Sequence, residues 1–155
     1  DSQWQIGATA IGQGNTVISP IHAAMLVSAI ANGGTLMKPY VIDSVQSTEG
    51  SVIEQYESEN YGTLMSASES SQLTKMMKAV VEEGTGYKLS GKNYSVAGKT
   101  GTAEVVGRGN NAWFVGFAPA DDPKIAICVL VEDAGTASSE AVPIAGEILD
   151  AYLNN

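Results

Sequence analysis

The chain has 155 residues, of which 44% are hydrophobic and 16% charged, a balance that suits one folded domain or a large part of one and argues against a disordered tail. Its formal net charge of −9 argues against nucleic acid or an anionic membrane surface as a partner, because such partners select basic surfaces. No apolar run reaches the ~18 residues of a membrane span, and the single cysteine, Cys128, lies in an apolar segment typical of a buried thiol.

The first third of the chain contains one strong helix signal. Residues 1–17 are polar and rich in glycine, and we predict that they form mostly loop that packs on the domain. Ser19 can cap the free amides of a helix, Pro20 fits its first position, and Gly33 ends it. Because this helix has almost no polar face, we expect it to be central and buried.

The middle of the chain combines a hairpin with a second helix. Two β-like runs within residues 40–56 flank a polar turn, which predicts a hairpin peripheral to the main sheet. Ser66 and Glu69 then form a capping-box pattern ahead of apolar residues at helical spacing. The pattern predicts an amphipathic helix that ends near Gly84, followed by a loop over residues 85–93.

The last third predicts three strands and a helix. The first strand is the run 96–104 (VAGKTGTAE), and the next two cover residues 112–118 and 125–131. The third is apolar on both faces, so both faces of the sheet should be covered. Residues 139–153 place apolar side chains on one face of a helix that should cover one face of the sheet. The predicted class is therefore α/β of the α+β type, with an antiparallel sheet flanked by helices.

The run 96–104 carries the chemistry. Side chains alternate along a strand that extends to Val106, so Thr100 and Thr102 should share one face while Lys99 and Gly101 occupy the other. An interior glycine weakens a strand and often marks a close approach by another backbone. An exposed strand of this kind can accept a peptide as one more strand, while the lysine and the hydroxyls capture a carboxylate.

The run resembles the K-T-G-T box of penicillin-binding transpeptidases and serine β-lactamases. Three further segments fall in the order of that family: residues 11–14 (IGQG) leading to 18–20 (ISP), residues 29–34 (AIANGG) and residues 114–119 (FVGFAP). Together they resemble the C-terminal part of a high-molecular-weight penicillin-binding protein. Residues 1–155 would then be the C-terminal portion of one transpeptidase domain and supply three of its five main strands.

The resemblance implies a peptidoglycan D,D-transpeptidase that cross-links stem peptides ending in D-Ala-D-Ala through an acyl-serine intermediate, and that β-lactams acylate. Lys99 and Thr102 would be catalytic. The substrate would be bound by Lys99, Thr100, Gly101 and Thr102, with the N–H of Thr102 donating to the oxyanion. No cofactor or metal is implied, and the parent protein would lie at the extracytoplasmic face of the bacterial membrane, anchored by a segment absent from this chain.

The nucleophile of the family is not found in this sequence. Its S-x-x-K motif needs a helix, whereas the Thr35–Lys38 pattern follows two glycines and precedes Pro39. Residues 58–60 spell the S-x-N motif of the family but follow the IGQG segment instead of preceding it. We therefore expect the nucleophile in a missing N-terminal half of the domain. The isolated chain should be inactive and should self-associate through the strand 125–131, which lacks a neighbour.

Two alternatives remain open at this stage. The chain could belong to a penicillin-binding-like module that recognises peptide or β-lactam without turnover, as a sensor or scaffold. It could also be a fragment of a serine β-lactamase. An upstream S-x-x-K motif would favour an enzyme, and sustained hydrolysis of a β-lactam would favour the β-lactamase.

Overall fold

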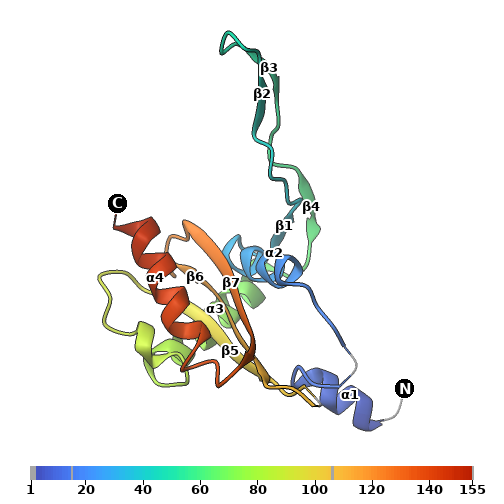
Figure 1. Cartoon of the computed structure of the whole chain (residues 1–155), viewed down its shortest axis with the longest axis vertical. Helices are drawn as coiled ribbons and strands as arrows, with labels where there is room; N and C mark the ends of the chain where they lie inside the picture. Colours follow the sequence, from blue (N-terminus) through green and yellow to red (C-terminus); the bar gives the residue numbers. More distant parts are fainter. Residues whose placement is uncertain (1–2, 15, 106, 155) are drawn as a thin grey trace.

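A computed structural model of the chain describes residues 3–14, 16–105 and 107–154. They form a three-stranded antiparallel sheet with helices on both faces, and a long arm built from two small two-stranded sheets extends from this body (Figure 1). The predicted sheet, flanking helices and peripheral hairpin are thus confirmed. Val106, predicted to end the first strand, lies outside the described residues. None of the helices in this part of the chain is long and apolar enough to cross a membrane.

The main sheet consists of β5 (Ala97–Ala103), β6 (Asn110–Ala118) and β7 (Ile125–Ala134), in the order β5-β6-β7. Both pairings are antiparallel, so β6 is the central strand. The three predicted strands are confirmed, although β6 and β7 are longer than predicted by two or three residues at one end. Strand β5 is shorter, because Glu104 and Val105 leave the sheet.

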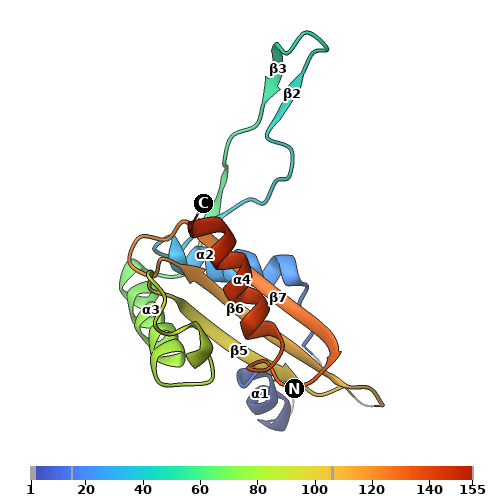
Figure 2. The same ribbon diagram turned by 60° about the vertical axis from the view of Figure 1, so that its left-hand side comes forward.

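Two apolar layers cover the sheet, one on each face. Helix α4 (Ala141–Leu153) lies across one face, where its side chains meet Phe114 of β6 in the larger core cluster (Figure 2). Helix α2 (Pro20–Ala31) covers the other face, where Phe117 of β6 is buried beside Val27. Phe114 and Phe117 therefore enter different cores, as strand alternation requires of residues three positions apart.

Local capping signals determine where two helices begin. The side chain of Ser19 accepts a hydrogen bond from the N–H of His22 at the start of α2. Helix α3 (Ala67–Glu82) begins with a complete capping box, in which Ser66 and Glu69 satisfy each other's backbone amides. A single 3-10 turn, η1 (Tyr87–Leu89), follows α3 and leads back to the sheet.

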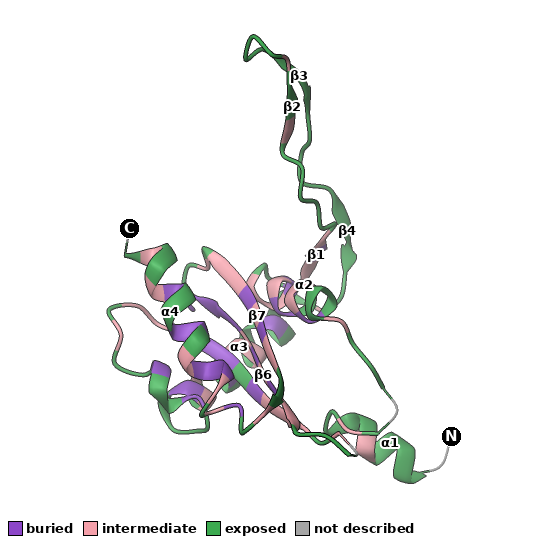
Figure 3. Cartoon of the chain, in the orientation of Figure 1, coloured by how far each residue is buried: buried purple, intermediate pink, exposed green. Residues whose placement is uncertain are grey.

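The arm is an extended structure that buries almost none of its side chains (Figure 3). Its outer part is the predicted hairpin, β2 (Ser44–Gln46) with β3 (Val52–Gln55). Its inner part pairs β1 (Thr35–Met37) with β4 (Asn60–Thr63), which the sequence did not predict. Both strands of the inner pair are short, and β4 is polar and exposed, so neither shows a strand-like apolar pattern.

Two expectations were wrong. Residues Gln3–Ala10 form a helix, α1, and not a loop, because the chain-breaking glycines 12 and 14 lie beyond its end; none of its described residues is buried. Helix α2 is also less enclosed than its composition predicted. Ala23, Val27 and Ala29 are buried, but Ile21 and Leu26 are 53% and 46% exposed. The sheet covers one side of α2, and its other side remains open.

A polar cluster holds the C-terminal helix to the loop that precedes β5. The ammonium group of Lys92 contacts one carboxylate oxygen of Asp150 at 2.5 Å, and the hydroxyl of Tyr94 donates to the other at 2.6 Å. The hydrogen bond from Lys92 and, to a smaller extent, the one from Tyr94 lower the pKa of Asp150 below its ordinary value.

The cluster predicts a specific dependence of stability on pH. Because the pKa of Asp150 is lower in the folded chain, its contribution is present above the unfolded value of about 4 and is lost as the pH falls through the folded value. Urea denaturation between about pH 3 and pH 7 measures the free energy of unfolding at each pH. As the pH falls, this free energy should decrease less in the Asp150→Asn variant than in the unsubstituted chain. Asp122→Asn, at an exposed ion pair with Lys124, is the control. Equal pH dependence in both variants would contradict the role of the cluster.

Candidate active site

Strand β5 has one paired and one open edge. It pairs with β6 along its whole length, from Ala97 opposite Phe117 to Ala103 opposite Asn111. Its other edge meets no strand in the described part of the chain. In an antiparallel pair, alternate residues direct both their N–H and their C=O away from the partner strand. The open edge can therefore receive a peptide as an additional strand.

Two side-chain contacts identify the residues that face the open edge. The carbonyl of Thr100 accepts a hydrogen bond from Nζ of Lys99 at 2.5 Å, and the carbonyl of Thr102 accepts one from Nε2 of Gln13 at 3.3 Å. Carbonyls that bind side chains in this way point away from β6. Since the N–H of a residue points to the same edge as its carbonyl, the N–H of Thr102 also faces the open edge.

The two threonine side chains share one face of β5, as predicted. Their partners on β6 belong to the core beneath α4. Thr100 is buried, and its hydroxyl hydrogen-bonds the hydroxyl of Thr85. The hydroxyl of Thr102 accepts a hydrogen bond from the N–H of Ala137 at 3.2 Å. Because a hydroxyl can donate one hydrogen bond while it accepts others, Thr102 keeps its proton for a further acceptor.

Lys99 lies on the opposite face, also as predicted. It is exposed, and its side chain borders a groove of about 560 Å³ between α2, α3 and the sheet. The other lining residues are apolar, among them Ile18, Leu26, Val27, Met76 and Val115. The ion pairs formed by the described residues involve other lysines, namely Lys38, Lys78, Lys92 and Lys124.

The glycines of β5 differ in what their missing side chains make possible. A Cβ at Gly98 would lie 2.3 Å from the ring of Phe114, so packing within the chain requires glycine there. A Cβ at Gly101 would meet only the Cβ of Trp113 at 3.5 Å, an ordinary contact. Packing among the described residues therefore does not explain glycine at position 101. Close approach by a ligand or another backbone is a usual reason for a glycine inside a strand.

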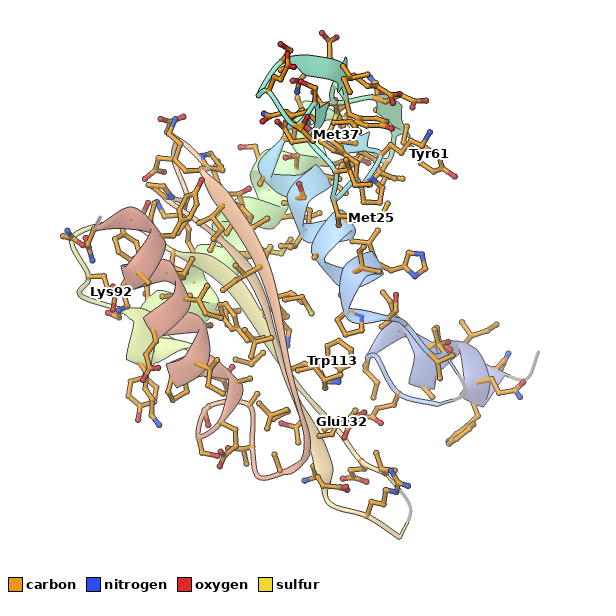
Figure 4. The ribbon with its side chains drawn as sticks, turned by 45° about the horizontal axis from the view of Figure 1, so that its top comes forward. Met25, Met37, Tyr61, Lys92, Trp113 and Glu132 are labelled. Carbon is orange, nitrogen blue, oxygen red and sulfur yellow. The ribbon has the colours of Figure 1, made fainter. Side chains whose placement is uncertain are left out.

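Trp113 and Gln13 extend the site beyond the residues predicted from the sequence. Trp113 is opposite Gly101 in the register, and its half-buried side chain projects from β6 on the side of the sheet where α1 and α2 lie (Figure 4). Gln13 belongs to the quoted IGQG segment, but its contact with Thr102 joins residues 89 positions apart. No sequence pattern indicated either role.

The two weak nucleophile candidates lie far from β5 along the arm. Thr35 is in strand β1, so it does not share a helix with Lys38, which pairs with Glu59 at 2.9 Å. Asn60 starts β4 and accepts a hydrogen bond from the N–H of Gly62. The prediction that residues 35–38 do not form a helix is thus confirmed, whereas the interpretation of residues 58–60 as a chance match to the family motif stays a prediction.

Three other residues of types that can carry chemistry, Thr85, His22 and Cys128, lie outside the open edge of β5. Thr85 precedes Lys88 with the same spacing as Thr35 and Lys38, but it lies in a turn, and its hydroxyl is bonded to Thr100. His22 is exposed, and its Nδ1 lies 2.9 Å from the hydroxyl of Ser19. Burial raises the pKa of Cys128, which favours the unreactive thiol form. Among the described residues, no group of three or more His, Cys, Asp or Glu side chains could hold a metal.

The chain is similar to proteins of one family over nearly its whole length. A family model for the penicillin-binding protein transpeptidase domain matches residues 1–150. The chain is 34% identical to the peptidoglycan D,D-transpeptidase PbpA of Mycolicibacterium smegmatis, with 96% of this chain and 32% of the relative covered. It is 33% identical to the peptidoglycan D,D-transpeptidase MrdA of Haemophilus influenzae, with 97% and 26% covered.

A solved structure is similar over the same extent. The ceftriaxone acyl-enzyme complex of penicillin-binding protein A from M. tuberculosis matches with a TM-score of 0.89 and 32% identity, covering 96% of this chain and 35% of that one. The chain thus spans about a third or less of the length of these relatives.

The contacts of the two glycines predict that similar substitutions at Gly98 and Gly101 affect stability differently. Gly98→Ala should lower the free energy of unfolding of the chain by about 1 to 3 kcal/mol, because the new methyl group overlaps the Phe114 ring. Gly101→Ala should change it by no more than about 0.5 kcal/mol. Urea denaturation of the two variants measures the difference. An equal loss at both positions would show that Gly101 is also required by packing.

Proposed function

Because the chain belongs to the penicillin-binding protein transpeptidase domain family, we propose that it is the C-terminal part of the transpeptidase domain of a peptidoglycan D,D-transpeptidase. In this proposal β5 is the edge on which the stem peptide and β-lactams bind. The parent protein works at the extracytoplasmic face of the membrane, where its substrate lies. The relatives named as peptidoglycan D,D-transpeptidases support this assignment.

The observation that carries the proposal is the open edge of β5 around Gly101. The edge presents backbone groups of Thr102 and a lysine, Lys99, that forms no ion pair with a carboxylate among the described residues. It also carries a glycine, Gly101, whose missing side chain leaves room for a ligand. An extended peptide with a terminal carboxylate matches all three features.

Each residue has a distinct role in the proposed acyl transfer. The N–H of Thr102 donates to the oxyanion that forms when a serine attacks the peptide or β-lactam carbonyl, a contact worth ~3 kcal/mol or more. The hydroxyl of Thr102 donates to the substrate carboxylate, held in place by the N–H of Ala137. Lys99 supplies positive charge that attracts the carboxylate and assists proton movement.

Thr100 can donate to the substrate only when its hydroxyl accepts the hydrogen bond that it shares with Thr85. Its hydroxyl is bonded to Thr85 on the face beneath α4, and the residue is only 7% exposed. A hydroxyl can still accept from Thr85 while it donates to a carboxylate at the strand edge. Thr100 is therefore a secondary contact, and Thr102 the main hydroxyl for substrate.

The nucleophile lies in another segment of the parent protein. None of the serines in the sequence is followed three positions later by lysine, the spacing that places a base one helical turn from the nucleophile. The chain spans about a third of its relatives, which leaves ample length for that segment. The part of the parent protein that this chain represents and the remaining part would together form one active site.

Acylation by penicillin G tests the function. The parent protein should form a stoichiometric adduct, and the isolated chain none, by intact mass. In the parent, Gly101→Val should lower the acylation rate constant by about tenfold or more, because the branched side chain fills the approach to the edge. Ala79→Val, on the exposed face of α3, is the matched control. A folded Gly101→Val protein with an unchanged rate, or an adduct on the isolated chain, would overturn the proposal.

The isolated chain should also self-associate. Strand β7 pairs with β6, and no other described strand covers its second edge. In the parent, strands from the other part of the domain would pair there. An uncovered strand edge recruits another chain. Light scattering should therefore show a mass that rises with concentration, and a monomer throughout the range would count against this edge as the site of association.

A further inference from the structure

Gln13 connects the N-terminal segment to the proposed substrate edge. It lies in the turn after α1, where Gly12 and Gly14 adopt φ values of 77° and 88° that favour glycine. The N–H of Gln13 donates to the carbonyl of Ala8 at 2.8 Å, which ties the turn to the end of α1. Its half-buried side chain then reaches the carbonyl of Thr102.

With this contact, two residues hydrogen-bond Thr102. The amide group of Gln13 binds its carbonyl, and the N–H of Ala137 binds its hydroxyl. The two partners come from opposite ends of the chain, one before α2 and the other before α4. Both contacts reduce the rotational freedom of the edge at the residue proposed to donate to the oxyanion.

A ligand that adds to β5 as a strand needs the carbonyl of Thr102 as well as its N–H. A carbonyl oxygen has two lone pairs, so the hydrogen bond from Gln13 leaves one acceptor position open. Gln13 fixes the direction of this carbonyl without using all of its capacity. The position left open lies next to Gly101, whose missing side chain leaves room for a ligand on the Trp113 side of the strand.

We propose that Gln13 is a positioning residue for substrate, which orients the Thr102 carbonyl to accept an amide N–H of the bound stem peptide or of an acylamino β-lactam. This inference rests on the proposed function of β5. It assigns to the IGQG segment a role in substrate binding, although the segment lies outside the strand. The opposite role, in which Gln13 blocks the carbonyl against the ligand, predicts the reverse effect of its removal.

Two β-lactams separate these roles. Penicillin G carries an acylamino N–H, and imipenem does not. In the parent protein, Gln13→Ala and the isosteric Gln13→Glu, which cannot donate to a carbonyl when ionised, should lower the acylation rate constant for penicillin G by about fivefold, the effect of one average hydrogen bond. The rate constant for imipenem should change much less. Gln72→Ala, an exposed glutamine on α3, should change neither.

Each outcome has a defined meaning. A selective loss for penicillin G supports the positioning role. An equal loss for both β-lactams would overturn it in favour of a purely structural role, a gain for penicillin G would overturn it in favour of a block, and no change would show that the contact is dispensable. Failure of the unsubstituted parent to react with either β-lactam would instead refute the proposed function itself.

Discussion

The structure depends on the burial of strand β6 on both of its faces. Phe114 and Phe117 are at most 1% exposed and belong to different core clusters, one beneath α4 and one beneath α2. Complete burial of one such side chain contributes roughly 1.5 to 3 kcal/mol. Because β5 is held by seven register pairs to β6, the positions of Lys99 and Thr102 follow from this packing. Gly98 makes room for the Phe114 ring and so links the core to the candidate site directly.

The half of β5 that supports the fold differs from the half proposed to bind substrate. Its first residues, Ala97 and Gly98, are buried, whereas residues from Gly101 onward are partly exposed. The carbonyl of Thr102 is hydrogen-bonded by Gln13 and its hydroxyl by Ala137, so these contacts, and not burial, order the proposed binding half. Such an arrangement leaves the strand rigid but accessible, as an added peptide strand requires.

Local signals in the sequence predicted much of this fold. The features that depend on contacts between distant residues could not be predicted in this way. The caps at Ser19 and Ser66 located α2 and α3 because capping involves neighbouring residues only. Alternation placed Lys99 and Thr102 on opposite faces for the same reason. Helix α1 was missed because it has no apolar stripe, and the β1–β4 pair because both strands are short and β4 is polar and exposed. The residues that hydrogen-bond the hydroxyls of Thr100 and Thr102 and the carbonyl of Thr102 are 15 to 89 positions away, so no local pattern encodes them.

In the proposed function, β5 forms the oxyanion and substrate edge for a nucleophile located elsewhere in the parent protein. A crystal structure of that protein acylated by penicillin G would test this role most directly. We expect the acyl carbonyl oxygen about 3 Å from the backbone nitrogen of Thr102, the ligand along the β5 edge beside Gly101, and the ester on a serine outside these residues. An acyl group attached within this chain, or bound away from β5, would contradict it.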